Sequence, residues 1–418
     1  MTDDILTPEE RARYTTVRSC LDGDITNAVA SARLGLTVRQ LQRLKRAVRK
    51  DGEAGVIHGN RSRTPHNATD EKTVASVIIF LKKKNHRDFG PTFAMEQLAK
   101  QEKIILSRET VRTIMRTNDL WKPKPRKGPV IHREWRERRA LFGELVQFDG
   151  SYHDWFENNG KECLLAAIDD ATSIISRAVF DANEGVHAVF RFWWKYIETH
   201  GLPVAIYLDK FSTYKINHKT AVDNEELMTQ FKRAMKELDV EVINANSPEA
   251  KGRIERLFGT LQDRMVKEMR LADIKDAEAA NRFLADTYIP DHNERFAVAV
   301  RQEGDAHRPL TKELIAKLPS IFSVQSERTV TNDFTLRFKN KWYQLAAQQE
   351  IAVYRGDTVT IEELLDGTVH IRLNDTYLMF SLINKLDRIV RPRVTASMKE
   401  RPRWKPPADH PWRRNQKP

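Results

Sequence analysis

Two aspartates in this sequence stand directly after apolar runs that have the length and composition of buried strands. Asp149 follows the run 145–148 in LVQFDGSYHDWF, and Asp209 ends the run PVAIYLD. A single aspartate at a strand end is commonly a turn or cap residue. Two of them in one domain favour a functional site, because sites form where the strands of an open α/β sheet end.

A third carboxylate, Glu255, falls in a long segment with the pattern of a helix. Ser247 suits the N-cap of this helix, Pro248 suits its first position, and Glu249 favours the positive end of its dipole. The buried stripe follows the 3,4 spacing of a helix and consists of Ile254, Leu257, Phe258, Leu261, Met265 and Met269. Glu255 lies beside this stripe, so its carboxylate can reach inward toward the strand ends.

Three carboxylates on two strands and one helix predict a site for a divalent cation. Mg²⁺ is a hard ion that takes one or two protein carboxylates and completes its octahedron with water and phosphate oxygens. Two such ions about 4 Å apart can assist an in-line phosphoryl displacement. The sequence therefore predicts phosphoryl transfer as the chemistry of this site.

Other carboxylates compete with these three. Asp169 and Asp170 lie in a predicted hairpin turn, where aspartate is common, so we interpret them as turn residues. Weaker competitors are Asp154, Glu157 and Glu249. The three candidates also have ordinary interpretations, as turn formers for the two aspartates and as a surface ion-pair partner for Glu255.

Two other kinds of catalytic site find no support in the sequence. Zinc sites need His and Cys at ligand spacing, and we find no such cluster. Neither a GxSxG elbow nor a GxxxxGK[ST] phosphate loop is present. The two cysteines, Cys20 and Cys163, are too far apart in sequence for a metal knuckle, and we expect both to be buried thiols in a reducing cytoplasm.

The elements that must position the carboxylates are expected between residues 141 and 300. Their predicted order is three strands (LVQFDG, then two in KECLLAAIDDATSIISRAVFDA), the helix VHAVFRFWWKYIETHG, the strand PVAIYLD, the helix TQFKRAMKELD, the strand VEVINAN and the long helix with Glu255. Hairpin strands followed by βαβ units are typical of a mixed sheet with helices packed against it.

The chain before this core is predicted to be all helical. Residues 1–56 form a first helix-turn-helix module, 57–70 a linker, 71–122 a second helix-turn-helix module and 123–140 a basic, proline-containing linker. In the first module a helix is expected to end near Gly35, and Thr37 can cap a second helix that buries Leu41 and Leu44. In the second module the last helix is expected to begin near Ser107 or Thr110. The candidate DNA-binding residues on the outside of these modules are Arg39, Arg43, Lys45, Arg49 and Arg112. A helical hairpin with a solvated cationic face is the alternative.

The chain after the core is predicted to contain a connector at 301–319, a small all-β barrel at 320–386 and a basic tail at 387–418. From Arg388 onward the tail has ten Lys/Arg and two Asp/Glu, a net charge of +8, and it is rich in proline. We expect it to be mostly disordered and to follow a phosphate backbone, or else to act as a solubilising tail. Its candidate DNA-binding residues are Arg388, Arg391, Arg393, Arg403 and Lys405.

The overall composition agrees with a multidomain protein that binds nucleic acid. The chain has 418 residues, enough for two to four domains, and its net charge is +12. A basic chain favours nucleic acid or an anionic membrane surface as its partner. No apolar run approaches the roughly 18 residues of a membrane span, and the N-terminus MTDDILTPEE is too acidic for a secretory signal, so we expect a cytoplasmic, nucleoid-associated protein.

Several motifs together resemble a known family. QFDGSYHDWF, IDDATSIISRAVF, YLDK and NANSPEAKGRIERLFGTLQDRMVKE are similar to segments of the DDE transposases of bacterial insertion sequences, most closely the ISNCY type. DHNERFAVAV resembles the segment with an Asn and an Arg that closes the core in that family, through Asn293 and Arg295. The resemblance covers most of the chain and implies an RNase H-like catalytic core, as in retroviral integrases.

The resemblance implies a specific reaction. Asp149, Asp209 and Glu255 would be the catalytic triad that binds two Mg²⁺ ions, with Mn²⁺ as a substitute, and Lys251 would lie near bound DNA. The enzyme would cleave the ends of a mobile element, expose 3′-hydroxyl groups and join them to target DNA without ATP. Its partners would be double-stranded DNA, from the terminal inverted repeats and the target, and further copies of the same chain in a homodimer or larger assembly.

The sequence departs from the family at two points. Lys210 and Phe211 follow the second aspartate, where many relatives have Asn-Gly. The separation of 46 positions between Asp209 and Glu255 exceeds the usual spacing, and we assign the surplus to an inserted loop, STYKINHKTAVDNEELM. The alternative functions are a non-catalytic DNA-binding protein (a regulator or a decayed transposase) and a nuclease or RNA-processing enzyme with the same core.

Overall fold

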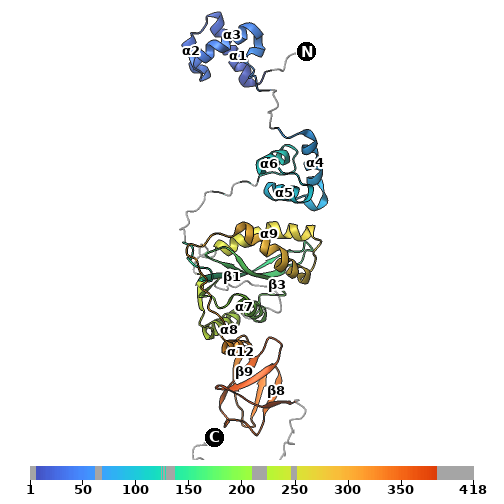
Figure 1. The fold of residues 1–418 in the computed structure, drawn as a ribbon, viewed down its shortest axis with the longest axis vertical. Coiled ribbons are helices and arrows are strands. Elements are labelled where there is room, and N and C mark those ends of the chain that lie inside the picture. The colour runs from blue at the N-terminus through green and yellow to red at the C-terminus, as the bar shows by residue number, and fades with distance from the viewer. Residues whose placement is uncertain are drawn as a thin grey trace, which may run out of the picture. The chain divides into compact units, whose positions relative to one another are not determined.

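The computed structural model describes residues 6–61, 68–123, 125, 128, 137–209, 224–245 and 252–383, without the side chains of 209, 224–228 and 245. Contacts within the chain divide it into two compact units, Met1–Pro123 and Lys124–Pro418. Their elements are labelled in Figure 1. Within the described ranges, every helix is too short or too polar to cross a bilayer.

The first three helices form a small group with its own core. They are α1 (Pro8–Asp22), α2 (Asn27–Leu34) and α3 (Val38–Asp51), followed by the 3₁₀ turn η1 (Gly52–Val56). Threonine side chains cap all three helices, and Thr37 forms a reciprocal capping box with Gln40. Gly35 ends α2 in the left-handed region, at φ +63°. The buried core residues of this group are Leu6, Val17, Cys20, Ala30, Leu41, Val48 and Val56.

A second helical group follows. It contains α4 (Glu71–Lys82), the 3₁₀ turn η2 (Lys84–His86), α5 (Pro91–Gln97), the π-helical turn η3 (Leu98–Glu102) and α6 (Arg108–Thr117). Asp70 caps α4 and Ser107 caps α6, each by accepting a hydrogen bond from the N–H three residues later. The predicted helix boundaries near Gly35, Thr37 and Ser107 are therefore confirmed.

The second unit contains a five-stranded mixed sheet. Its strands are β1 (Leu145–His153), β2 (Glu162–Asp169), β3 (Ile175–Asp181), β4 (Ala205–Asp209) and β5 (Glu241–Ala245), in the spatial order β3-β2-β1-β4-β5. β1, β2 and β3 pair antiparallel, whereas β4 runs parallel to β1 and β5 parallel to β4. The predicted mixed sheet of the core is confirmed.

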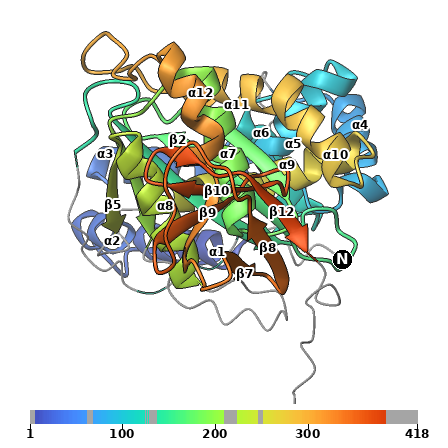
Figure 2. The same cartoon turned by 90° about the horizontal axis from the view of Figure 1, so that it is seen from below.

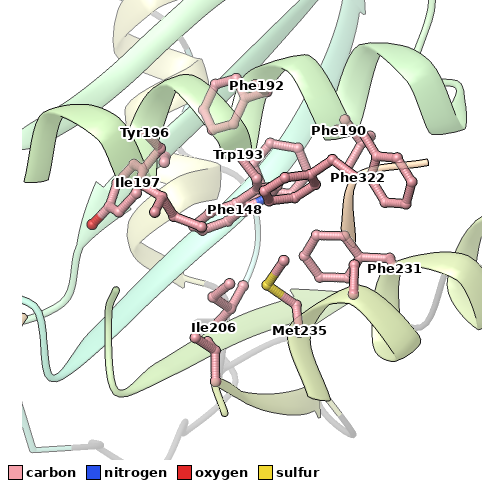
Figure 3. Close-up of a cluster of buried hydrophobic side chains, with 14 of the residues drawn as sticks. Phe148, Phe190, Phe192, Trp193, Tyr196, Ile197, Ile206, Phe231, Met235 and Phe322 are labelled. Atoms are coloured by element: carbon pink, nitrogen blue, oxygen red, sulfur yellow. The ribbon is translucent and has the colours of Figure 1, made fainter. Parts of the chain in front are cut away.

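Helices cover both faces of this sheet (Figure 1). On one face lie α7 (Val186–His200) and α8 (Asn224–Glu237). Phe148 of β1 points into this layer among the aromatic rings of α7, with residues of α8 on the other side (Figure 3). The labelled side chains around Phe148 are Phe190, Phe192, Trp193, Tyr196, Ile197, Ile206, Phe231, Met235 and Phe322. Burial of this cluster fixes which side chains of β1 face the opposite layer.

On the other face lie α9 (Gly252–Leu271), α10 (Ala277–Phe283), the π-helical turn η5 (Leu284–Tyr288) and α11 (Ile289–Phe296). All six residues of the predicted stripe of α9 are buried. Asn281 and Asn293 each bond both backbone groups of one residue of the edge strand β3, Phe180 and Ile175 respectively, at 2.7–3.1 Å. Asn293, from the predicted closing segment of the core, thus holds α11 against the edge of the sheet.

The last part of the described chain is β-rich. After α12 (Lys312–Ile321), the strands β11 (Thr376–Tyr377), β10 (Val369–Leu373), β9 (Thr358–Glu363) and β6 (Val324–Thr329) form one sheet in that order. β12 (Phe380–Ile383), β8 (Lys341–Leu345) and β7 (Thr335–Phe338) form another. The two sheets share one hydrophobic core, and Figure 2 shows their strands gathered together. We call the two sheets the β domain.

The β domain is joined to the α/β core by polar contacts. Gln230 and Arg233 of α8 donate hydrogen bonds to the carbonyls of Gln325, Ile321 and Ser323 at 2.6–3.0 Å. Within the domain the buried carboxylate of Glu362 accepts from Arg372 Nε at 2.9 Å and from the hydroxyls of Ser320 and Tyr377. Glu362 and Arg372 therefore form a buried ion pair, with Glu362 0% exposed.

Of the two predicted boundaries before Glu255, one lies outside the described residues and the other differs from the structure. The helix with Glu255 is described from Gly252, and its predicted cap residues Ser247 and Pro248 lie outside the described residues. The end of the predicted inserted loop is helical instead, because α8 begins at Asn224. Residues 210–223 of that loop lie outside the described residues.

Candidate active site

Asp149 lies near the middle of β1 and is partly buried. The prediction that the strand ends at Asp149 is wrong, because the backbone pairing with β2 continues to His153. Side chains alternate between the two faces of a strand. Val146 and Phe148 face α7 and α8, so Gln147, Asp149 and Ser151 belong to the face that α9 covers. In the antiparallel ladder Asp149 stands opposite Ala166 of β2, which is buried in the core beneath α9.

The helix α9 crosses β1 directly over Asp149. The backbone N–H of Ile254 donates to Oε1 of Gln147 at 3.2 Å, and Nε2 of Gln262 donates to Oγ of Ser151, also at 3.2 Å. These two contacts bracket Asp149 along the strand and the segment 254–262 along the helix. Glu255 lies in this segment, in the first turn of α9, and is exposed beside the buried Ile254.

Asp209 is the last residue of β4, the strand that runs parallel to β1. The register pairs Leu145 with Ala205, and Gln147 with Tyr207, a constant offset of 60 residues. The pairing ends at Gln147 and Tyr207, and the same offset continued for two more residues relates Asp149 to Asp209. On its other side, the backbone of Asp209 pairs with that of Ala245 in β5.

A metal cluster is not complete among the side chains that the structure describes. Within that set, no group of three or more His, Cys, Asp or Glu side chains is placed to hold an ion. The side chain of Asp209 is outside the set. The triad of Asp149, Asp209 and Glu255 is consequently a proposal.

The backbone beside Asp149 is closely packed on the opposite face. A Cβ atom on Gly150 would lie 2.6 Å from Oε2 of Glu184, so only glycine fits here without displacing that carboxylate. Burial raises the pKa of the nearby Cys163 thiol, and the negative charges of Glu184 and then of Asp181 and Asp149 raise it further. The Cys163 thiol is therefore kept protonated and unreactive.

Asp169 has the structural role predicted for it. Its Oδ1 accepts from the N–H and the hydroxyl of Thr172 at 2.7 Å each, and its Oδ2 accepts from the N–H of Gly143 at 3.0 Å. Burial raises the pKa of this carboxyl, while the hydrogen bonds from Thr172 and Gly143 oppose the rise. Asp169 closes the β2–β3 turn and ties it to the start of β1.

Asp170 has contacts beyond the turn that contains it. This residue is fully buried, and its Oδ1 accepts from Nε2 of Gln147 at 2.8 Å and from Nη1 of Arg253 at 2.7 Å. Its Oδ2 accepts from the backbone N–H of Arg139 at 3.0 Å. The sequence interpretation of Asp170 as a turn residue missed these contacts, because Arg253 is 83 residues away.

Comparison with known proteins gives two kinds of similarity. No family model matches the chain. Among solved structures, the catalytic core domain of the HTLV-2 integrase in complex with magnesium aligns with a TM-score of 0.27 and 16% identity, over 36% of this chain and 91% of that chain. A simian T-cell lymphotropic virus intasome in complex with a PP2A regulatory subunit aligns with a TM-score of 0.31 and 14% identity, over 68% of this chain and 93% of that chain.

Sequence relatives are much closer. A putative transposase of Sinorhizobium fredii, y4bF, is 33% identical over 383 residues, which cover 91% of this chain and 82% of the relative. This chain belongs to the transposases. The transposase for insertion sequence IS1202 of Streptococcus pneumoniae is 28% identical to it, over 97% of this chain and 93% of the relative.

The predicted DNA-binding residues of the transposase begin on α3. Arg39, Arg43 and Arg49 are exposed on this helix. Lys45 is not: its Nζ donates to the carbonyl of Cys20 at 3.2 Å and to Oδ1 of Asn27 at 3.1 Å. The expectation that Lys45 faces outward with the arginines is wrong, because its ammonium group joins α3 to α1 and α2 inside the helical group.

Two exposed cations of α3 were missed. Arg46 and Lys50 continue the spacing of Arg39 and Arg43 along the helix, and all four side chains are exposed. We call these four residues the α3 stripe. At 3.6 residues per turn they share one face, opposite the buried Leu41 and Val48. The 3,4 spacing of these four cations is visible in the sequence. Lys45 falls outside this spacing and so is not part of the α3 stripe.

The remaining predicted DNA contacts are divided between α6 and undescribed residues. Arg112 of α6 is partly buried and donates to Glu109 at 2.6 Å, whereas Arg108 and Arg116 of the same helix are exposed. The candidates outside the described residues are Lys251, Arg388, Arg391, Arg393, Arg403 and Lys405.

Proposed function

We propose that this transposase binds the ends of a mobile element, cleaves them to expose 3′-hydroxyl groups and joins those groups to target DNA. Both steps are phosphoryl transfers, and both use one site formed by Asp149, Asp209 and Glu255. Family membership supports the general activity. The proposal assigns its residues and its chemistry.

One observation carries the assignment of residues. The register between β1 and β4 relates Asp149 to Asp209 by the same offset as the paired residues before them. In parallel strands such positions are neighbours on one face of the sheet. The first turn of α9 is held to Gln147, two residues before Asp149, and this turn contains Glu255. These two relations support a shared site for three carboxylates that are distant in sequence.

The donor set fits Mg²⁺, with Mn²⁺ as a substitute. Carboxylate oxygens are the ligands that these hard ions prefer, and an exposed Glu255 leaves room for water and phosphate oxygens. Asp149, Asp209 and Glu255 would hold two ions, which when bound lower the charge repulsion between the attacking oxygen and the phosphate and stabilise the leaving oxygen. This assignment needs only carboxylates as protein ligands of the ions.

The protein itself contributes rigidity and position. Asp149 and Asp209 are on strands within a hydrogen-bonded sheet, and Glu255 is on a helix whose apolar face is buried. Such elements hold side chains more precisely than loops do. Cationic residues outside the sheet would contact the nucleic acid backbone. These contacts would orient the phosphodiester over the site.

We further propose that the two helical groups are helix-turn-helix modules that recognise the element ends. In this assignment α3 and α6 are the second, DNA-contacting helices of the two modules. The α3 stripe gives the first module a continuous row of phosphate or base contacts. The basic tail, including Arg388 and Lys405, would add contacts to the backbone, and synapsis of two ends would need a homodimer or larger assembly.

The test is cleavage of a labelled duplex whose sequence is taken from the DNA that flanks this reading frame. The full chain should nick it at the element end in the presence of Mg²⁺, and the product should carry a 3′-hydroxyl group. Asp149→Asn, Asp209→Asn and Glu255→Gln should each reduce the rate by roughly 10³-fold or more, the scale of losing a group essential to the reacting centre. Asp154→Asn changes a nearby, partly buried loop carboxylate that accepts from the N–H groups of Asn158 and Asn159, and it should keep full activity.

Binding must be measured beside cleavage. If wild type and Asp149→Asn bind the duplex equally and neither nicks it, the protein is a non-catalytic DNA-binding protein and the proposal fails. Cleavage of unrelated duplexes at the same rate, with no joining to a target plasmid, would instead indicate a nuclease. Both outcomes contradict the function proposed here.

A further inference from the structure

The buried carboxylate of Asp170 joins segments that are far apart in sequence. Its Oδ1 accepts from Gln147 on β1 and Arg253 on α9, and its Oδ2 accepts from the backbone of Arg139, before β1. Its own N–H donates to the carbonyl of Leu145, where β1 begins. A residue that only formed the β2–β3 turn would need local partners alone, and Asp169 already supplies those.

The partners of Asp170 flank the candidate catalytic residues. Arg253 is two residues before Glu255 on α9, and Gln147 is two residues before Asp149 on β1. Gln147 also accepts the backbone N–H of Ile254, so the same amide side chain contacts both Asp170 and the first turn of α9. Gln147, Asp170 and Arg253 therefore form one network, which we call the Asp170 network.

The Asp170 network is removed from water, so its hydrogen bonds need good geometry. Asp170 is 0% exposed and the Arg253 side chain 11% exposed. An ion pair removed from water stabilises a protein only when its geometry is good, and its clearest use is to specify one arrangement of the elements that it joins. Here the specified arrangement is the position of the first turn of α9 on β1.

The remainder of α9 is fixed by a different contact. Gln262 reaches Ser151 two turns further along the helix, and the apolar stripe packs on the sheet between. An apolar face tolerates small slides and rotations of a helix, whereas charged hydrogen bonds at one end do not. A catalytic carboxylate has to be held within about 0.5 Å of its working position. The Asp170 network supplies that constraint at the end of the helix that carries Glu255.

We propose that Asp170 and Arg253, with Gln147, are positioning residues that set the separation between the carboxylates of Asp149 and Glu255. This inference depends on the proposed function for its purpose, since it assumes that both carboxylates share bound metal. The residues of the network would not touch the metal or DNA. They would act through the strand and the helix that carry the ligands.

The test uses the full chain and two readouts other than turnover. Mn²⁺ binding is measured from the electron paramagnetic resonance signal of the free ion, and hydrogen exchange is measured for the amides of residues 253–258. Arg253→Met should weaken Mn²⁺ binding by about tenfold or more, the usual effect of removing a residue that orients a metal ligand, and should speed exchange in the first turn of α9. Arg253→Lys, which keeps the charge, should restore part of both.

The β domain offers a matched control. Arg372 pairs with the buried Glu362 as Arg253 pairs with Asp170, at 2.9 Å and 2.7 Å respectively. Arg372→Met removes an arginine of the same kind and should lower the stability of the protein, yet it should leave Mn²⁺ affinity and exchange in α9 unchanged. If Arg253→Met and Arg372→Met affect Mn²⁺ binding equally, the inference is overturned.

A second variant keeps the test decisive if Arg253→Met does not fold. Gln147→Leu removes the acceptor of the Ile254 N–H while leaving the pair of Asp170 and Arg253 in place. It should speed exchange in the first turn of α9 and weaken Mn²⁺ binding by a smaller factor than Arg253→Met. Wild-type exchange in this variant contradicts the inference. A wild-type chain that neither binds Mn²⁺ nor cleaves DNA contradicts the proposed function instead. In that case the exchange data still test whether the Asp170 network fixes the first turn of α9.

Discussion

The helix α3 and the first turn of α9 both carry exposed charged side chains and charged side chains that are hydrogen-bonded within the protein. On α3 the α3 stripe is exposed, while Lys45 donates its hydrogen bonds to Cys20 and Asn27 within the helical group. On α9 Glu255 is exposed, while Arg253 is buried against Asp170. In both places an exposed charge and an internally bonded charge lie only two residues apart.

The difference between these neighbours separates ligand recognition from architecture. A charge with internal partners adds stability or fixes a geometry, and its removal leaves a desolvated partner behind. An exposed charge adds little to stability and is available to a phosphate or a metal ion. The comparison predicts that substitutions two residues apart will have opposite consequences for folding and for binding.

The largest expected effect concerns α9. Asp170→Ala leaves the Arg253 guanidinium buried without its carboxylate, and it should lower the free energy of unfolding by about 3–5 kcal/mol. Glu255→Ala should leave the free energy of unfolding essentially unchanged although it abolishes cleavage. Urea unfolding followed by tryptophan fluorescence measures both. Equal destabilisation by the two variants would contradict the distinction between internally bonded and exposed charges.

A buried histidine that stays neutral should make the stability of the protein depend on pH. Burial, followed by the charge of Arg264, lowers the pKa of His292 from 6.5 to about 4. Since the unfolded chain binds this proton more readily than the folded protein, stability from this group is fully present above about pH 6.5 and is lost as the pH falls toward 4. The loss should approach roughly 3 kcal/mol at most, at 1.36 kcal/mol per pKa unit.

His292→Phe should reduce that acid sensitivity. The imidazole of His292 contacts the stacked ring of Tyr288 and the tilted ring of Phe296, so a phenyl ring can take its place without a titratable nitrogen. The measurement is the melting temperature of wild type and variant between pH 4 and pH 7. Parallel curves would mean that His292 does not supply the pH dependence assigned to it.

Lys45 should behave as an architectural residue in spite of its place on a basic helix. Lys45→Met removes hydrogen bonds from a charged donor that is only partly buried, and it should lower stability by about 1–2 kcal/mol. The dependence of DNA affinity on salt should not change. If Lys45→Met instead flattens the salt dependence with no loss of stability, Lys45 contacts DNA and the assignment from the structure is wrong.

Arg43→Met is the matched variant, two residues away on the α3 stripe. Its stability should stay close to that of wild type, because the side chain is exposed. The slope of log affinity against log salt concentration for end DNA should fall by about 1, as expected for the loss of one phosphate contact. An unchanged slope would place the DNA on another face of the helical group.

Local structure was accessible from the sequence because its causes are local. The cap at Thr37, the glycine that ends α2 and the apolar stripe of α9 each depend on residues within a few positions of one another. The strands at Asp149 and Asp209 could be predicted for the same reason. The alternation of β1, with Phe148 facing α7, follows from its pattern of apolar residues.

The contacts that distinguish neighbouring charges could not be predicted in the same way. Asp169 and Asp170 appear equivalent in sequence, yet one closes a turn and the other receives Arg253 and Gln147 from separate elements. The spacing of the α3 stripe leaves Lys45 out, but the bonds of Lys45 to Cys20 and Asn27 depend on how α1 and α2 pack against α3. Such roles depend on tertiary packing, which brings together residues far apart in sequence.

The central claim is that carboxylates from β1, β4 and α9 bind metal together. Its most direct test is anomalous diffraction at the manganese edge from crystals of the full chain with Mn²⁺ and an end duplex. The account predicts anomalous peaks within coordination distance of Asp149 and Asp209, with Glu255 a ligand of at least one ion. Peaks held by Asp169 and Asp170 instead, or none near β1 in a complex that contains DNA, would contradict it.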